Sequence, residues 1–204
     1  NLFSGPTVNA ARGIANQVNN AVSGFIYNFM TALNPQITKS YATGEYSYMM
    51  SLVYQGARFS FYLLFFLSLP ILINTHYILV IWLKIIPAHA VIFVKLTLIF
   101  ALSESISYPL ITAMLATGNI KKYQLVVGGL QLLNLPISYI LLRFGFCSET
   151  VLVVAIIVSQ LCLFARLIML RDIINLSFVD FMKKVCMNII VVASLSSIIP
   201  IIVS

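Results

Sequence analysis

Charged residues are scarce in this chain of 204 residues. They make up 8% of the sequence, with 12 Lys and Arg against 5 Asp and Glu, whereas soluble domains carry about 25%. Hydrophobic residues account for 61%. A soluble core does not need so much apolar surface, so the composition excludes a soluble domain and predicts that lipid is part of the solvent. The basic residues fall mostly between hydrophobic runs, which indicates membrane orientation and no nucleic-acid partner.

The sequence also lacks the motifs that most enzymes carry. Its three cysteines, Cys147, Cys162 and Cys186, show no CxxC spacing, so they indicate neither a disulfide framework nor a metal site. We find no nucleophile–base pair, no glycine-rich phosphate loop and no cluster of metal ligands in the sequence. We therefore expect a protein that is not an enzyme and uses neither a cofactor nor a metal.

Long hydrophobic runs recur along the chain at nearly even spacing, which predicts a single, all-α, polytopic transmembrane domain over residues 1–204. The predicted bundle has about six membrane helices, over residues 5–42, 46–73, 89–116, 122–143, 150–171 and 178–203. The piece NTHYILVIWLKIIPAHA has an apolar core too short to span, so we expect an interfacial helix or loop there. Ser177, three residues before Asp180, has the spacing of a helix N-cap.

Most Lys and Arg residues lie in or near the loops that follow the first, third and fifth segments. This bias places those loops in the cytoplasm and the start of the chain outside. Because no signal sequence is visible and residue 1 is Asn, we expect a fragment whose upstream helices are missing. Pro70, Pro109 and Pro136 fall inside predicted membrane helices, where each can kink its helix. Kinked helices favour a transporter over a static bundle.

The first segment carries an unusual number of polar side chains for a membrane helix. At about 100° per residue, one stripe roughly 100° wide contains Asn9, Arg12, Asn16, Asn20, Ser23, Tyr27, Thr31 and Asn34. Each unsatisfied amide that faced lipid would cost several kcal/mol, so the stripe must meet water or other helices. Helix–helix packing is the alternative, but it usually needs only one or two polar residues per helix. We expect a substrate cavity that suits a hydroxyl-rich ligand.

Three charged residues inside the predicted helices are further candidates. Glu104 lies near the middle of the third segment, where a charge is costly and usually functional. It is a candidate for proton or cation coupling, and the alternatives are a structural ion pair or a buried neutral acid. Arg12 and Lys95 are possible phosphate contacts, with snorkelling to the outer surface as the alternative for both. Lys95 lies about 180° around the helix from Glu104.

Three stretches resemble a known family: NAARGIANQVN, NPQITKSYA and ATGNIKKYQLVVGGLQLLNLPISY. They are similar to those of polysaccharide repeat-unit flippases, also called O-antigen flippases or lipopolysaccharide biosynthesis proteins. These belong to one superfamily with the multidrug and toxic-compound extrusion proteins. The resemblance implies two helical bundles around a central cavity, of which this chain is most of the second. It also implies that Asn9, Arg12, Asn16 and Asn20 line the cavity.

The expected substrate follows from the same resemblance. It is an oligosaccharide linked to polyprenyl pyrophosphate, moved from the inner to the outer leaflet of the bacterial inner membrane. The expected partners are this lipid-linked oligosaccharide, membrane lipids and the missing N-terminal bundle. Three alternatives stay open: a drug or metabolite exporter of the same superfamily, a membrane glycan polymerase or ligase, and a purely structural subunit.

Overall fold

The computed structural model describes residues 5–174 and 176–203, and 87% of the described residues are helical with no strand among them. The helices in chain order are α1 (Pro6–Ala42), α2 (Tyr46–Ile73), α3 (Thr75–Leu83), α4 (Ala90–Ser105), α5 (Tyr108–Ala116), α6 (Ile120–Tyr123), α7 (Gly129–Leu132), α8 (Asn134–Arg143), α9 (Thr150–Ile174), α10 (Phe178–Phe181) and α11 (Asn188–Val203). Two π-helical turns, η1 (Gln124–Gly128) and η2 (Met182–Met187), continue α6 and α10.

Four helices of the described residues are long and apolar enough to cross a membrane. They run over Tyr46–Ile73, Ala90–Ala116, Ile120–Arg143 and Thr150–Ile174. These four correspond to the second to fifth predicted segments, so the chain is a helical membrane protein. The first predicted segment, α1, is one continuous helix but is not in this set, because its polar side chains lower its mean hydropathy. The predicted count of about six thus stays a prediction.

Two prolines determine where the membrane helices break. A proline ring clashes with the carbonyl group four residues earlier and removes a backbone hydrogen bond. Accordingly, α4 ends at Ser105, four residues before Pro109, and α7 ends at Leu132, four residues before Pro136. Pro70 has no such effect, since α2 continues past it. Both breaks lie within apolar spans, at the level of the candidate site described below.

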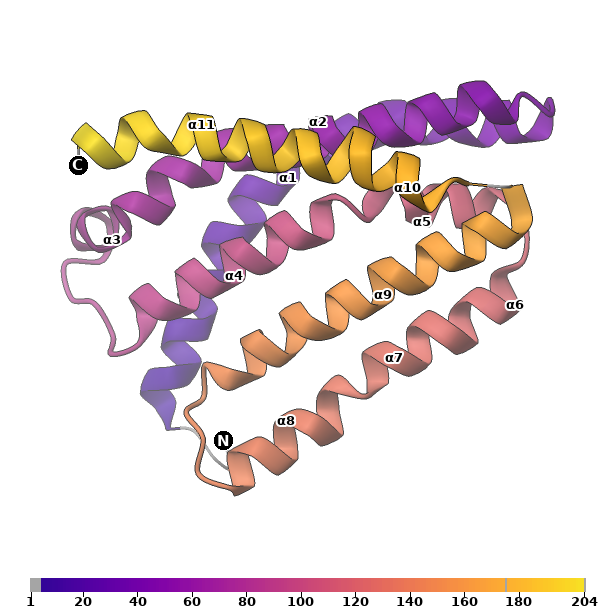
Figure 1. Ribbon diagram of the computed structural model, residues 1–204. Helices are drawn as coiled ribbons and strands as arrows, with labels where there is room; N and C mark the ends of the chain where they lie inside the picture. Colours follow the sequence, from indigo (N-terminus) through magenta and orange to yellow (C-terminus); the bar gives the residue numbers. More distant parts are fainter. Residues whose placement is uncertain (1–4, 175, 204) are drawn as a thin grey trace.

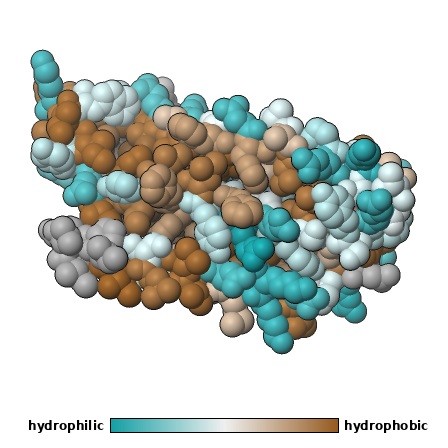
Figure 2. All heavy atoms as spheres, turned by 90° about the horizontal axis from the view of Figure 1, so that it is seen from above, coloured by the Kyte–Doolittle hydropathy of each residue, from teal (hydrophilic) through white to brown (hydrophobic). Residues whose placement is uncertain are grey.

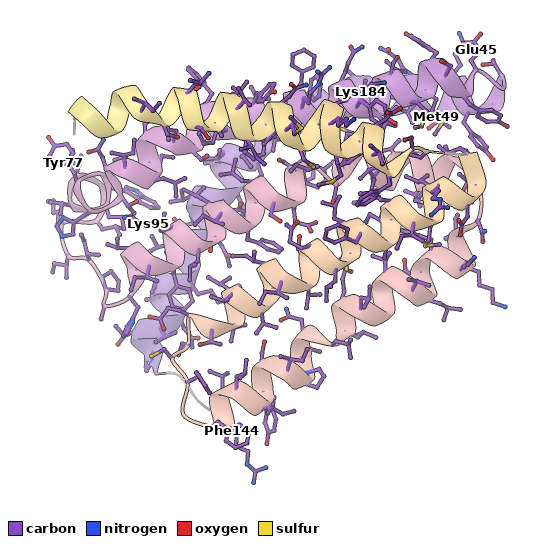
Figure 3. The ribbon with its side chains drawn as sticks, in the orientation of Figure 1. Glu45, Met49, Tyr77, Lys95, Phe144 and Lys184 are labelled. Carbon is purple, nitrogen blue, oxygen red and sulfur yellow. The ribbon has the colours of Figure 1, made fainter. Side chains whose placement is uncertain are left out.

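The helices pack side by side with their loops alternating between two ends (Figure 1). α1 packs against α2, α4 and α5, while α9 packs against α4 and α8. Figure 3 places Glu45, in the turn between α1 and α2, at the opposite end from Tyr77 of α3 and Phe144 after α8. Figure 2 shows hydrophobic residues over a broad part of one face and hydrophilic residues gathered towards the end of the α1–α2 turn. This arrangement matches the predicted alternation of loops.

Two local predictions concern an interfacial piece and an N-cap. The N-cap is confirmed, whereas the place of the short piece at a membrane interface stays a prediction. The expected interfacial piece contains the nine-residue helix α3, which is too short to span a bilayer. Its Tyr77 and Ile81 side chains are exposed. The predicted N-cap is present as well, because the backbone N–H of Asp180 donates to Ser177 Oγ at 3.2 Å. α9, in contrast, extends to Ile174, three residues past the predicted end of the fifth segment.

Candidate functional site

The polar stripe of α1 lies on the side of that helix that its neighbours leave uncovered. α1 buries a mostly apolar face against α2, α4 and α5, which includes Ala11, Ala15, Val22, Ile26 and Met30. The exposed predicted cavity residues are Asn9, Arg12, Asn16, Asn20 and Tyr27. The structure therefore brings these five together on one open face of the chain.

Ser23 is the exception among the predicted cavity residues. Its side chain is buried, with 6% of its surface exposed, and Ser23 Oγ donates to Asn19 Oδ1 at 3.3 Å. The residue lies at the edge of the stripe, next to the buried Val22. Ser23 thus belongs to the packed side of α1.

The end of the stripe near the α1–α2 turn contacts α5. Thr112 Oγ1 of α5 donates to Asn34 Oδ1 of α1 at 2.7 Å. One turn earlier on α5, the ring of Tyr108 lies 5.9 Å from the ring of Tyr27, centroid to centroid. These contacts fix the half of the stripe that lies beyond Ser23, while its first half carries the exposed amides and Arg12.

Glu104 takes part in a hydrogen-bond network between α4 and α9. Its side chain is half-buried, and Ser159 Oγ donates to Glu104 Oε1 at 2.5 Å. The same Ser159 hydroxyl lies 3.3 Å from Ser103 Oγ, which accepts a hydrogen bond from Gln160 Nε2. The carboxyl group of Glu104 is therefore held by the Ser159 hydroxyl across the α4–α9 helix pair.

A pocket of about 210 Å³ opens beside this network, between α4, α9 and the break from α7 to α8. Its lining residues are Phe100, Glu104, Gln131, Asn134, Ala155, Val158 and Ser159. The break near Pro136 brings two amides, from Gln131 and Asn134, towards the carboxylate. Carboxylate, hydroxyl and amide oxygens are the ligand types that hard cations prefer. The lining of the pocket therefore presents several oxygen atoms of these types.

Lys95 and Arg12, the predicted phosphate contacts, both lie outside this pocket. Lys95 is exposed on the first half of α4, where Figure 3 labels it. Its separation of nine residues from Glu104 places the two about 180° apart around the helix. Arg12 is exposed on the stripe. The structure brings neither of them into the Glu104 network.

Arg166 is a functional candidate that the sequence pattern did not single out. Arg166 is only 1% exposed and lies within the apolar span of α9. Its Nε donates to the hydroxyl of Tyr123 at 3.3 Å, and its Nη1 donates to Ser107 Oγ at 3.0 Å. The sequence signal for this position is the spacing on α9. Arg166 follows Ser159 by two helical turns, so the two residues lie on the same face of the helix.

A second missed contact joins the loops at the opposite end. His89 Nδ1 lies 2.5 Å from Glu149 Oε1, which connects the start of α4 to the start of α9. The side chain of Glu149 is 13% exposed, whereas that of His89 is 48% exposed. This pair helps to hold α4 and α9 in the register that places Ser159 against Glu104.

Comparison with known proteins does not assign a family. No protein-family model, curated protein or solved structure matches the chain.

Proposed function

We propose that this protein is a flippase that moves an oligosaccharide linked to polyprenyl pyrophosphate from the inner to the outer leaflet of the bacterial inner membrane. The observation that carries the proposal is the open polar stripe of α1 in a chain that is otherwise rich in apolar helices. The cargo is inferred from the resemblance to polysaccharide flippases, which covers residues 9–19, 34–42 and 116–139.

The length of the stripe suits a path across the whole bilayer. From Asn9 to Asn34 it extends about 38 Å at a rise of about 1.5 Å per residue. The hydrocarbon core of a bilayer is about 30 Å thick. A polar face of that length, if it faced lipid, would leave amides unsatisfied at every depth, so it must border water or polar partners. A glycan, which is rich in hydroxyl groups, can exchange hydrogen bonds with Asn and Tyr side chains along this face.

Other groups take the remaining roles in this proposal. Arg12 provides a planar guanidinium group for the pyrophosphate, with Lys95 as a second possible contact. The polyprenyl tail remains in lipid. The pocket at Glu104 exchanges a proton or monovalent cation and thereby couples the return step to an ion gradient. The N-terminal bundle of the protein would supply the facing wall of the cavity.

The test is transfer of a labelled polyprenyl-pyrophosphate oligosaccharide between the leaflets of proteoliposomes that contain the full-length protein. We expect transfer by the wild type and at least a tenfold loss in Arg12→Ala and in Glu104→Gln. Phe66→Ala changes an exposed residue of α2 and is the matched control, for which we expect transfer near the wild-type rate. Absence of transfer, together with efflux of a small cationic dye, would refute the proposal and favour an exporter of drugs or metabolites.

A further inference from the structure

Arg166 is a permanently charged side chain buried between membrane helices. Both of its described hydrogen bonds go to neutral hydroxyl groups, those of Tyr123 and Ser107. An isolated charge in such a place is costly unless an opposite charge compensates it. The guanidinium group does not lose its proton in proteins, so neutralisation by deprotonation does not relieve this cost.

No acid forms a direct ion pair with Arg166 among the described residues. The two ion pairs in the described part of the chain are His89–Glu149 and Lys184–Asp180. Two further acids, Glu45 and Asp172, lie in exposed positions at helix ends. Glu104 is therefore the one acid of the described residues that shares a membrane-buried helix interface with Arg166.

The geometry places the two charges on one side of α9. Ser159, which donates to Glu104, and Arg166 are separated by two helical turns, so they lie on the same face of α9 and about 10 Å apart along its axis. On the opposing helices, Ser107 follows Glu104 by three residues and binds the guanidinium group. The buried Cys162 lies between Ser159 and Arg166 on the same face of α9.

We propose that Arg166 is a positioning residue that compensates the negative charge of Glu104 through the α4–α9 interface. When the Glu104 carboxylate is ionised, the pair is neutral as a whole and both charges are tolerated in the membrane. A monovalent cation that enters the Glu104 pocket then meets the positive field of Arg166. If the axial separation of Ser159 and Arg166, about 10 Å, is taken as the distance and the effective dielectric constant is about 20, this field weakens cation binding by about tenfold. This last consequence rests on the proposed coupling function, whereas the charge compensation does not.

A double-mutant cycle on the full-length protein tests the compensation directly. The variants are Glu104→Gln, Arg166→Gln, the double variant and Arg166→Lys, and the measurement is the thermal unfolding midpoint in detergent. Each single Gln variant leaves one buried charge without its partner, so we expect each to lower the midpoint by about 6 °C or more. The double variant should lose clearly less than the sum of the two. Arg166→Lys, which keeps the charge, should lose less than Arg166→Gln.

Strictly additive losses would overturn the proposal, because they would reduce Arg166 to a hydrogen-bond donor for Ser107 and Tyr123. An unchanged midpoint in Glu104→Gln would overturn it as well, since the carboxyl group would then carry no charge that Arg166 has to balance. Lys95→Gln removes an exposed charge from the same helix as Glu104 and serves as the control, with no coupling to Arg166→Gln expected. The cycle needs no transport, so a negative leaflet-transfer assay would refute only the proposed function.

Discussion

Gly56 is a position where α2 packs closely against α1 and α5, and its substitution tests that packing sharply. A Cβ atom there would collide with Leu33 Cδ2 and would lie 3.0 Å from Cγ of Pro109 and 3.4 Å from its Cβ. The leucine can move, but the proline ring cannot. Overpacking costs about 1–3 kcal/mol, while replacing a helical glycine by alanine gains about 1 kcal/mol of helix propensity. Gly56→Ala should thus be destabilised by about 1 kcal/mol, and Gly56→Val by about 3 kcal/mol.

The assay is the thermal unfolding midpoint of the purified protein in detergent. For a chain of this size, about 3 kcal/mol corresponds to a decrease of about 6–12 °C in Gly56→Val. Gly13→Val is the matched control, because no atom lies within 4 Å of a Cβ built at Gly13. Its midpoint should stay within about 2 °C of the wild type. Equal midpoints for the two variants would refute the proposed close packing of α2 against α1 and α5.

Two further predictions concern single hydrogen bonds. Thr112→Val removes the 2.7 Å bond to Asn34 and should lower the free energy of unfolding by about 1 kcal/mol in a denaturation experiment. Thr31→Val should have less effect, because the Thr31 hydroxyl donates to the Tyr27 carbonyl group of its own helix. Ser177→Ala removes the cap on the N–H of Asp180 and should lower the free energy of unfolding by about 1 kcal/mol. Hydrogen exchange should become faster only at the start of α10, and unchanged exchange there would contradict the cap.

Helix positions could be predicted from the sequence because glycine and proline residues near the helix ends determine many of the boundaries. The stretches ATGEY and ATGN mark the turns after α1 and α5, and Gly44 and Gly118 adopt positive φ angles there. The ends of α4 and α7 likewise follow from Pro109 and Pro136, through the clash with the carbonyl group four residues earlier. Such signals act over a few residues and do not require knowledge of the partner helices.

The partners of the polar side chains could not be predicted in the same way. Arg166 falls inside the predicted segment 150–171, but the charge rule counts basic residues near the end of an apolar run together with those of the adjoining loop. α9 continues to Ile174, so Arg166 is deeper in the span than that count implies. Ser23 shared the helical stripe of the amides, yet the position of neighbouring helices decides which edge of a stripe is covered. Burial of this kind is a property of tertiary packing, which a periodic pattern on one helix does not contain.

An aqueous path for a polar cargo along the α1 stripe requires that the side chains of the stripe meet water. The most direct test introduces single cysteines in a cysteine-free full-length protein and measures labelling by a membrane-impermeant thiol reagent. Asn16→Cys and Asn20→Cys should be labelled, and lipid-linked oligosaccharide should slow the labelling. Phe25→Cys, exposed on α1 but roughly opposite the stripe, should stay unlabelled. Labelling at Phe25 that equals labelling at Asn16 and Asn20, or none at either asparagine, would contradict an aqueous path along the stripe.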